Sequence, residues 1–321
     1  AVVVGPLSHA AGDAVGGGIQ YTSASPVRTP RLRGGRRARR PRVGRASPRN
    51  DTRASTRTDC TTNTTTCTYA EEMTNFANWW TYYRTRMQMM DVINPRHIRH
   101  GHMVNINKQI MVEGMRADFL AVDALSQKLI EKCRRTKRVT CKTAAGTDYV
   151  AELSPKLNWV KTSGLITPAK WGNLPGGEIF TSPFNSNGRF VVDGVVGDYL
   201  CQKYGDIGAT PLTIDIKDNR IAGLACSNQE LLAEFDKYCH TDENSNRVGE
   251  FAIGTNLACT HIIGHILQDE KLPGIHIAFG HPYSEHTGQT WKSTTHIDCV
   301  GRHFDIWLDD EQVMAKGKFL I

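Results

Sequence analysis

The chain has 321 residues, of which 40% are hydrophobic, enough for one large domain or two of ordinary size. No apolar run approaches the roughly 18–20 residues of a membrane-spanning helix, so we expect no membrane partner. The net charge of +7 arises in residues 1–60, which contain 12 Arg and three Asp and sum to +9, whereas the remainder sums to −2. Most of the chain therefore gives no reason to expect a nucleic-acid partner.

Cysteine usage favours a reducing compartment. The nine cysteines are odd in number and scattered, and none forms a C-x-x-C motif. This pattern is typical of a reduced protein rather than of a disulfide framework, so we expect a cytoplasmic location.

Residues 1–58 form an Arg-rich segment that we expect to be disordered or poorly structured. The run "RTPRLRGGRRARRPRVGRASPR" has ten Arg in 22 residues, with Pro and Gly throughout. Such a composition cannot bury enough apolar surface to order itself. Three interpretations stay open: a nucleic-acid arm, a disordered tail, or the product of GC-rich DNA translated in the wrong frame, because Lys is absent.

Residues 59–96 have a different character. Aromatic residues at helical spacing predict one amphipathic helix from about Tyr69 to Met90. The segment "YAEEMTNFANWWTYYRTRMQMM" resembles a short part of PilY-type adhesins of the type IV pilus tip. This similarity ends after about 30 residues, so it implies no adhesive function for the rest. The abrupt change near residues 90–96 suggests the hypothesis of a chimeric chain or a misassembled reading frame.

Residues 97–321 predict an α+β (α/β-like) domain with a mixed sheet. Residues 106–133 have the apolar spacing of a helix, and residues 139–153 alternate as two strands around a Gly turn. Short strands follow within residues 178–226, and a helix is expected over residues 228–241. Later apolar runs read as further strands.

A few polar residues adjoin these later strands. In "STTHIDCVG", His296 and Asp298 are two residues apart, so in a strand they face the same side. Such a pair is half of a metal site or an ordinary hydrogen-bonded pair. Glu178 and Glu250 each follow Gly just before an apolar run, and His276 lies between two Ile. Taken singly, these are surface carboxylates and a core histidine.

Together these residues resemble a known family. About residues 97–321 are similar to the aminopeptidase T / AmpS / PepS metallopeptidases (thermophilic metallopeptidases, leucyl aminopeptidase-like), through "GMRADF", "GTD", "NLPGGEIFTSP", "GEFAIGTN", "DEKLPGIHIAFG" and "THID". In that family two glutamates, a histidine, a tyrosine and a closing H-x-D bind a pair of metal ions. The resemblance places these ligands on Glu178, Glu250, His276, Tyr283, His296 and Asp298. It also implies a peptide substrate and a homodimer.

The sequence departs from that family in three places, one of which is a short interval from Tyr283 to His296 that predicts a reduced substrate-facing loop. Lys271, Leu272, Pro273 and Gly274 intervene between the Asp-Glu of "DEK" and the strand with the histidine, where small residues are usual. Residues 1–90 stand where the family has an N-terminal α/β domain and do not resemble it. Contacts made by that domain are therefore not expected here.

The expected function is a metalloaminopeptidase that hydrolyses the N-terminal residues of peptides with a water activated by two divalent ions, Zn, Co or Mn. Glu178 and Glu250 are the expected catalytic carboxylates, and Asp298 is the candidate to bridge the ions. His281 and His286 are either substrate-facing or exposed loop histidines.

Two alternatives belong to other classes. His276, His296 and Asp298 alone make the two-histidine, one-carboxylate set of Fe(II) oxygenases, and the related 2,5-dihydroxypyridine 5,6-dioxygenases cleave a ring with one Fe(II). The other alternative is an inactive relic domain in a chimeric chain.

Overall fold

The computed structural model describes residues 2–4, 51–52, 66–67, 101–167 and 170–321. The chain divides into two units, Ala1–Asp13 with Gln88–Ile321, and Ala14–Met87. The described part of the second unit is an antiparallel pair of β2 (Asp51–Thr52) and β3 (Thr66–Cys67). The disordered segment over residues 1–58 and the amphipathic helix of residues 59–96 concern residues almost wholly outside this description, so both stay predictions.

An antiparallel sheet of eight strands forms one layer of the main unit. Its spatial order is β12 (Arg220–Ala225), β11 (Leu212–Lys217), β10 (Asn185–Val192), β6 (Asp148–Glu152), β5 (Arg138–Lys142), β16 (Asp305–Leu308), β17 (Glu311–Ala315) and β18 (Lys318–Phe319). The predicted hairpin over residues 139–153 is present as β5 and β6. Gly146 lies in its turn with φ of 110°, a conformation that suits glycine.

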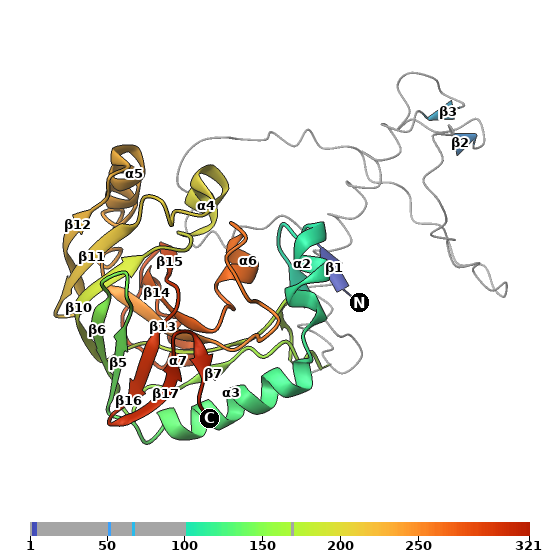
Figure 1. Ribbon diagram of the computed structural model, residues 1–321. Helices are drawn as coiled ribbons and strands as arrows, with labels where there is room; N and C mark the ends of the chain where they lie inside the picture. Colours follow the sequence, from blue (N-terminus) through green and yellow to red (C-terminus); the bar gives the residue numbers. More distant parts are fainter. Residues whose placement is uncertain (1, 5–50, 53–65, 68–100, 168–169) are drawn as a thin grey trace. The chain divides into compact units, whose positions relative to one another are not determined.

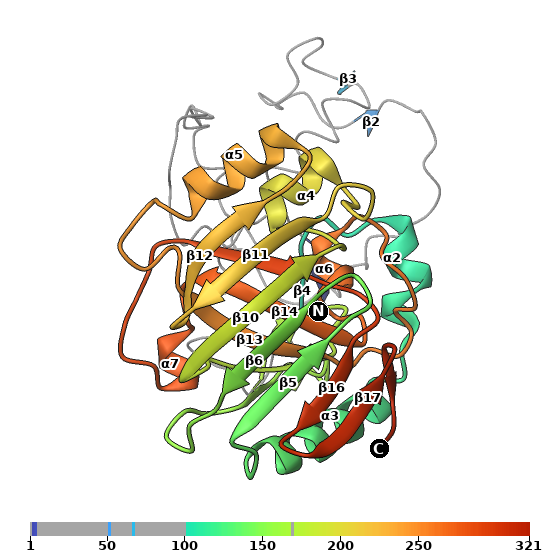
Figure 2. The same cartoon turned by 60° about the vertical axis from the view of Figure 1, so that its left-hand side comes forward.

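A second antiparallel sheet of five strands lies behind the first in Figure 2. Its order is β15 (His296–Val300), β14 (Gly274–Gly280), β13 (Val248–Gly254), β9 (Glu178–Thr181) and β7 (Val160–Lys161). Every residue of β9, β13 and β14 is buried. The rings of Phe251 on β13 and Tyr149 on β6 stack with centroids 6.3 Å apart, so the two sheets meet across one hydrophobic core.

The two faces of the five-stranded sheet have different chemistry because side chains alternate along a strand. Odd-numbered residues, including Phe251, Ile277 and Ile297, belong to the hydrophobic core. The even-numbered residues on the opposite face include Glu250 and His276. The same strands therefore build the core and present the predicted site.

Helices and one small sheet make up the rest of the unit as far as its residues are described. The helices are α2 (Lys108–Val112), the 3-10 turn η1 (Gly114–Arg116), α3 (Phe119–Cys133), α4 (Asp198–Tyr204), α5 (Gln229–Tyr238), α6 (Ile266–Asp269) and α7 (Ser284–Thr287). Parallel strands β1 (Val2–Val4), β4 (Gly101–Met103) and β8 (Gly172–Asn173) form the small sheet. Figure 1 shows α3, the longest of the described helices, lying along one side of the unit. The α+β class is confirmed.

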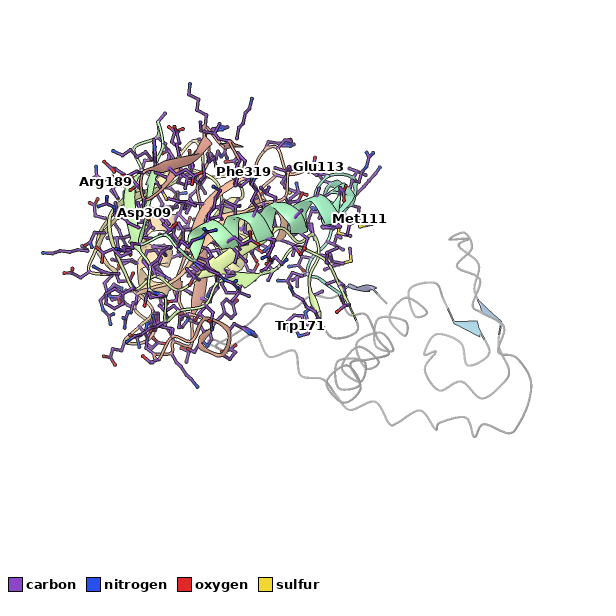
Figure 3. The ribbon with its side chains drawn as sticks, turned by 90° about the horizontal axis from the view of Figure 1, so that it is seen from below. Met111, Glu113, Trp171, Arg189, Asp309 and Phe319 are labelled. Atoms are coloured by element: carbon purple, nitrogen blue, oxygen red, sulfur yellow. The ribbon has the colours of Figure 1, made fainter. Side chains whose placement is uncertain are left out.

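The single helix expected over residues 106–133 is wrong in detail. The chain breaks between α2 and α3, where the Asp118 side chain accepts hydrogen bonds from the N–H groups of Leu120 and Ala121 and caps α3. At the break, Gln268 of α6 accepts from the Gly114 N–H at 3.0 Å and donates to Glu113 at 2.8 Å. Figure 3 shows Met111 and Glu113 at one end of the unit and Arg189 at the other.

No helix within the described residues is long and apolar enough to cross a membrane.

Candidate metal centre

The register of the five-stranded sheet brings the predicted residues together. Glu250 and Asp298 both pair with Ala278, which lies between them on β14. His276 pairs with Ala252 of β13, and His296 pairs with Gly280. Since the side chains of Ala252 and Ala278 are only methyl groups, they leave room for the larger polar groups beside them.

Both imidazoles face carboxylates through their Nε2 atoms. His276 Nε2 lies 3.5 Å from an oxygen of Glu178 and 3.5 Å from one of Glu250. His296 Nε2 lies 3.6 Å from the other oxygen of Glu250 and 3.3 Å from Asp298. Glu250 therefore stands between the two histidines and joins the five side chains into one cluster, in which His296 and Asp298 are half-buried and the other three are buried.

The orientation of His296 is fixed from behind. Its Nδ1 lies 2.9 Å from the backbone carbonyl oxygen of His281, which accepts a hydrogen bond from it. This contact leaves Nε2 as the atom directed at the carboxylates. Histidines that bind metals are commonly oriented by such a carbonyl. The side chain of His281 accepts from the Tyr283 N–H, and His286 is exposed on α7, away from these contacts.

Tyr283 lies at the edge of the cluster. It precedes α7 in a left-handed conformation, with φ of 48°, and its ring centroid is 4.8 Å from that of His296. Burial and the nearby carboxylates of Glu250 and Asp298 raise the pKa of its hydroxyl well above the usual value. All six residues expected from the sequence therefore lie in one place.

Sequence reasoning missed two further members, Glu270 and Lys271. The Lys271 ammonium lies 2.7 Å from Glu178 and 2.6 Å from Glu270, and its side chain is 2% exposed. An oxygen of Glu270 also lies within 4.8 Å of ligand atoms of His276 and Asp298. Both residues belong to "DEKLPG", which leads directly into the strand that carries His276. This closeness in sequence to a predicted ligand is the feature that could have indicated them.

The cluster contains more acidic than basic side chains. Four carboxylates, of Glu178, Glu250, Glu270 and Asp298, surround one lysine and two histidines. Burial lowers the pKa of His276 and of His296, but the carboxylates raise these values more, to about 9 and about 10. Burial raises the pKa of Glu270 to about 8. The site thus stabilises positive charge strongly.

These groups fit a divalent cation. Glu250, His296 and Asp298 offer ligand atoms within 4.8 Å of one another, as do Glu178, Glu250 and His276. Carboxylate oxygens and imidazole nitrogens are ligands of Zn, Mn and Fe(II). The carboxylates favour the protonated form of both histidines, and a bound metal ion would displace those protons.

The chain is similar to proteins of known class. The sequence model of the thermophilic metalloprotease (M29) family matches residues 121–303, which include all eight residues of the cluster and its edge. A 2,5-dihydroxypyridine dioxygenase from Pseudomonas putida KT2440 shares the fold, with a TM-score of 0.54, 18% identity, and coverage of 68% of this chain and 65% of that chain. Wild-type AmpT from Thermus thermophilus does so with a TM-score of 0.50, 19% identity, and coverage of 66% and 58%.

The chain therefore spans less than two thirds of the length of either solved structure. At these identities the likeness concerns the fold. No curated protein matches the chain.

Proposed function

The chain belongs to the thermophilic metalloprotease (M29) family, and from this premise we propose that it is a metal-dependent aminopeptidase that releases N-terminal residues from peptides. The observation that carries the proposal is the buried acidic cluster, in which Glu250 lies between the Nε2 atoms of His276 and His296. A divalent ion held there would polarise the scissile carbonyl and make a water molecule acidic enough to attack it.

Each residue of the site has a proposed role. Glu250, His296 and Asp298 would hold the ion, with His276 and Tyr283 beside them. The carbonyl of His281 keeps His296 in the orientation that offers Nε2. Glu178 and Glu250 remain the proposed catalytic carboxylates, since both contact His276 from the buried side. A peptide with a free amino terminus is the proposed substrate, because that amine is itself a potential metal ligand.

The test compares peptides that differ only at the amino terminus. The purified full chain, freed of metal with a chelator and then given Zn²⁺, Co²⁺ or Mn²⁺, should shorten a free peptide one residue at a time. It should leave the N-acetylated peptide intact. Hydrolysis that persists in chelator, or equal cleavage of both peptides, would contradict the proposal.

A ring-cleaving Fe(II) dioxygenase is the second candidate. It is favoured by one observation: Asp298 lies 3.3 Å from His296 Nε2 and also offers an oxygen within 4.8 Å of a ligand atom of His276, so one carboxylate lies near two histidines. Oxygen uptake with Fe(II) and 2,5-dihydroxypyridine, without peptide hydrolysis, would establish it over the aminopeptidase. Failure of both assays with a metal bound would favour the relic-domain hypothesis.

We also propose a cytoplasmic location and a homodimer. The location is supported by the seven cysteines from Cys133 to Cys299, which are free and buried. The dimer rests on the family resemblance and is tested by light scattering during size-exclusion chromatography, where the mass of one chain would contradict it.

A further inference from the structure

Lys271 is an unusual residue to find inside a metal centre. It follows the short helix α6 and is 1% exposed, among the most deeply buried side chains described. Its ammonium contacts Glu178 Oε1 at 2.7 Å and Glu270 Oε1 at 2.6 Å. A buried charge is tolerated only when it is paired, and here one cation neutralises part of two carboxylates.

We propose that the Lys271 ammonium permanently occupies the place of a second divalent ion, so that the centre binds one metal ion per chain. That single ion is held by Glu250, His296 and Asp298, with His276 beside it. The inference rests on the proposed metal centre and changes the two-ion expectation drawn from the sequence.

The first argument is the sharing of oxygen atoms. A second ion would bind beside His276 with either Glu178 and Glu250 or Glu270 and Asp298, so it would need an oxygen of Glu178 or of Glu270. Glu178 Oε1 and Glu270 Oε1 already accept hydrogen bonds from Lys271, and the other oxygen of Glu178, Oε2, is the one 3.5 Å from His276 Nε2. Glu178 Oε1 also accepts from the Thr162 hydroxyl at 2.7 Å. A metal that shared Oε1 of either residue at a bond length of about 2.0–2.2 Å would lie within about 5 Å of the ammonium.

The second argument is electrostatic. Two like charges at that distance repel, and burial weakens the screening that water would provide. A second dication would therefore have to displace a buried ammonium that is paired with two carboxylates.

The third argument is that the lysine cannot easily move away. Its N–H donates to the Gln268 carbonyl at 2.9 Å, and its own carbonyl accepts from the Asn256 N–H at 3.1 Å. The carbonyl oxygen of the next residue, Leu272, packs directly against β13: a Cβ added to Gly254 would be only 1.9 Å from it. The ammonium is thus delivered from a fixed backbone.

An ammonium differs from a metal in what it contributes. It holds Glu178 and Glu270 in place and cancels one charge, but it offers no empty coordination position to a substrate. Catalysis then depends on one ion with protein ligands and an open position, as in single-zinc peptidases. The same ion would have to polarise the substrate carbonyl and activate the attacking water.

The experiment measures metal stoichiometry directly. The full chain is stripped with chelator, titrated with Zn²⁺ by calorimetry, and analysed after dialysis by inductively coupled plasma mass spectrometry. The wild type should bind one Zn²⁺ per chain, and Lys271→Arg should also bind one. Lys271→Met removes the charge, keeps much of the volume, and should bind two.

The matched control is Lys203→Met. Lys203 also bridges two carboxylates, Glu230 and Glu234, at 2.7 Å each, but its side chain is 34% exposed between α4 and α5. Removing it should leave one Zn²⁺ per chain. Melting curves give a second signal: Zn²⁺ should raise the melting temperature of Lys271→Met more than that of the wild type, since each bound ion stabilises the folded state.

The outcomes separate this inference from the proposed function. Two Zn²⁺ in the wild type would overturn the inference while keeping the metal centre, and this arm stands even if Lys271→Met does not fold. One Zn²⁺ in both the wild type and a folded Lys271→Met would also overturn it. No bound Zn²⁺ in any variant would overturn the metal centre itself, and the inference with it.

Discussion

His296 and Asp298 are adjacent partners on one strand face, 3.3 Å apart, and each contributes a different ligand type. Changing either His296 or Asp298 to Ala should abolish metal-dependent peptide hydrolysis and lower Zn²⁺ affinity at least about 100-fold, because a metal with too few ligands binds weakly. Glu178→Gln should be milder, since the amide oxygen still accepts from Lys271 and Thr162. Calorimetric titration with Zn²⁺ and turnover of a leucine anilide would measure both effects.

The control for that series is His240→Ala. His240 is exposed at the end of α5 and pairs with Asp236, away from the cluster. Its removal should change neither affinity nor turnover. If His296→Ala retained full Zn²⁺ affinity with an intact fold, His296 would not be a ligand.

Asp242 gives a pH-dependent prediction at the residue scale. Its carboxylate accepts hydrogen bonds from the Asn244 N–H, from the Ser293 hydroxyl, and from the N–H and hydroxyl of Thr294. Ser293 and Thr294 lie just before β15. Burial raises its pKa, but the hydrogen bonds from Thr294 and its neighbours lower it more, so the net pKa is below the ordinary value. The unfolded chain has a pKa of about 3.9, so this stabilisation is present above about pH 4 and is lost as pH falls through the folded pKa.

Asp242→Asn should therefore lower the free energy of unfolding by about 1–3 kcal/mol at pH 6, the usual worth of hydrogen bonds to a charged group. The difference from wild type should shrink as the pH falls below about 4. Urea unfolding at pH 6, 4 and 3 would measure it. Asp148→Asn, on the exposed start of β6, is the control. A difference that stays constant with pH would show that the charge of Asp242 does not matter.

At the scale of secondary structure, β13 depends on a close approach of two backbones. A Cβ on Gly254 would lie 1.9 Å from the Leu272 carbonyl oxygen. Gly254 pairs with both β9 and β14, so its strand cannot shift easily. Gly254→Ala should lower the free energy of unfolding by about 1–3 kcal/mol through overpacking.

The comparison is Gly223→Ala on the edge strand β12, where a Cβ would meet Asp215 at an ordinary 3.5 Å. That change should stay within about 0.5 kcal/mol. Chemical denaturation of both variants would decide. Equal stability of Gly254→Ala and wild type would mean that the Leu272 carbonyl moves freely.

Sequence patterns predicted these elements unevenly. The alternation around His296 and Asp298 predicted their shared strand face, because side-chain period alone decides it. The break between α2 and α3 was not predicted, because apolar spacing continues across it and the contact that fixes it, from Gln268 to Gly114, spans 154 residues. The positions of Glu270 and Lys271 depend on how the loop after α6 folds against β13. No periodicity encodes such a loop, so a lysine there reads as a surface residue.

At the scale of the whole molecule, residues 1–58 carry the basic charge, and the metal centre is built from residues 178–298. The described contact that connects this segment to the main unit is the pairing of the three-residue strand β1 with β4. Deleting residues 1–58 should change the free energy of unfolding by no more than about 0.5 kcal/mol, as for changes away from packed features. Thermal unfolding of the deletion variant and the full chain would measure it, and a large loss would show that the segment packs.

The central claim is that the face of β13, β14 and β15 opposite the core holds a catalytic metal ion. The most direct measurement is an anomalous difference map from crystals grown with Zn²⁺, recorded on both sides of the zinc absorption edge. The account predicts one peak within about 2.0–2.3 Å of ligand atoms of Glu250, His296 and Asp298, with the Lys271 ammonium still between Glu178 and Glu270. The account would be contradicted if crystals grown in saturating Zn²⁺ showed no anomalous peak within bonding distance of these side chains.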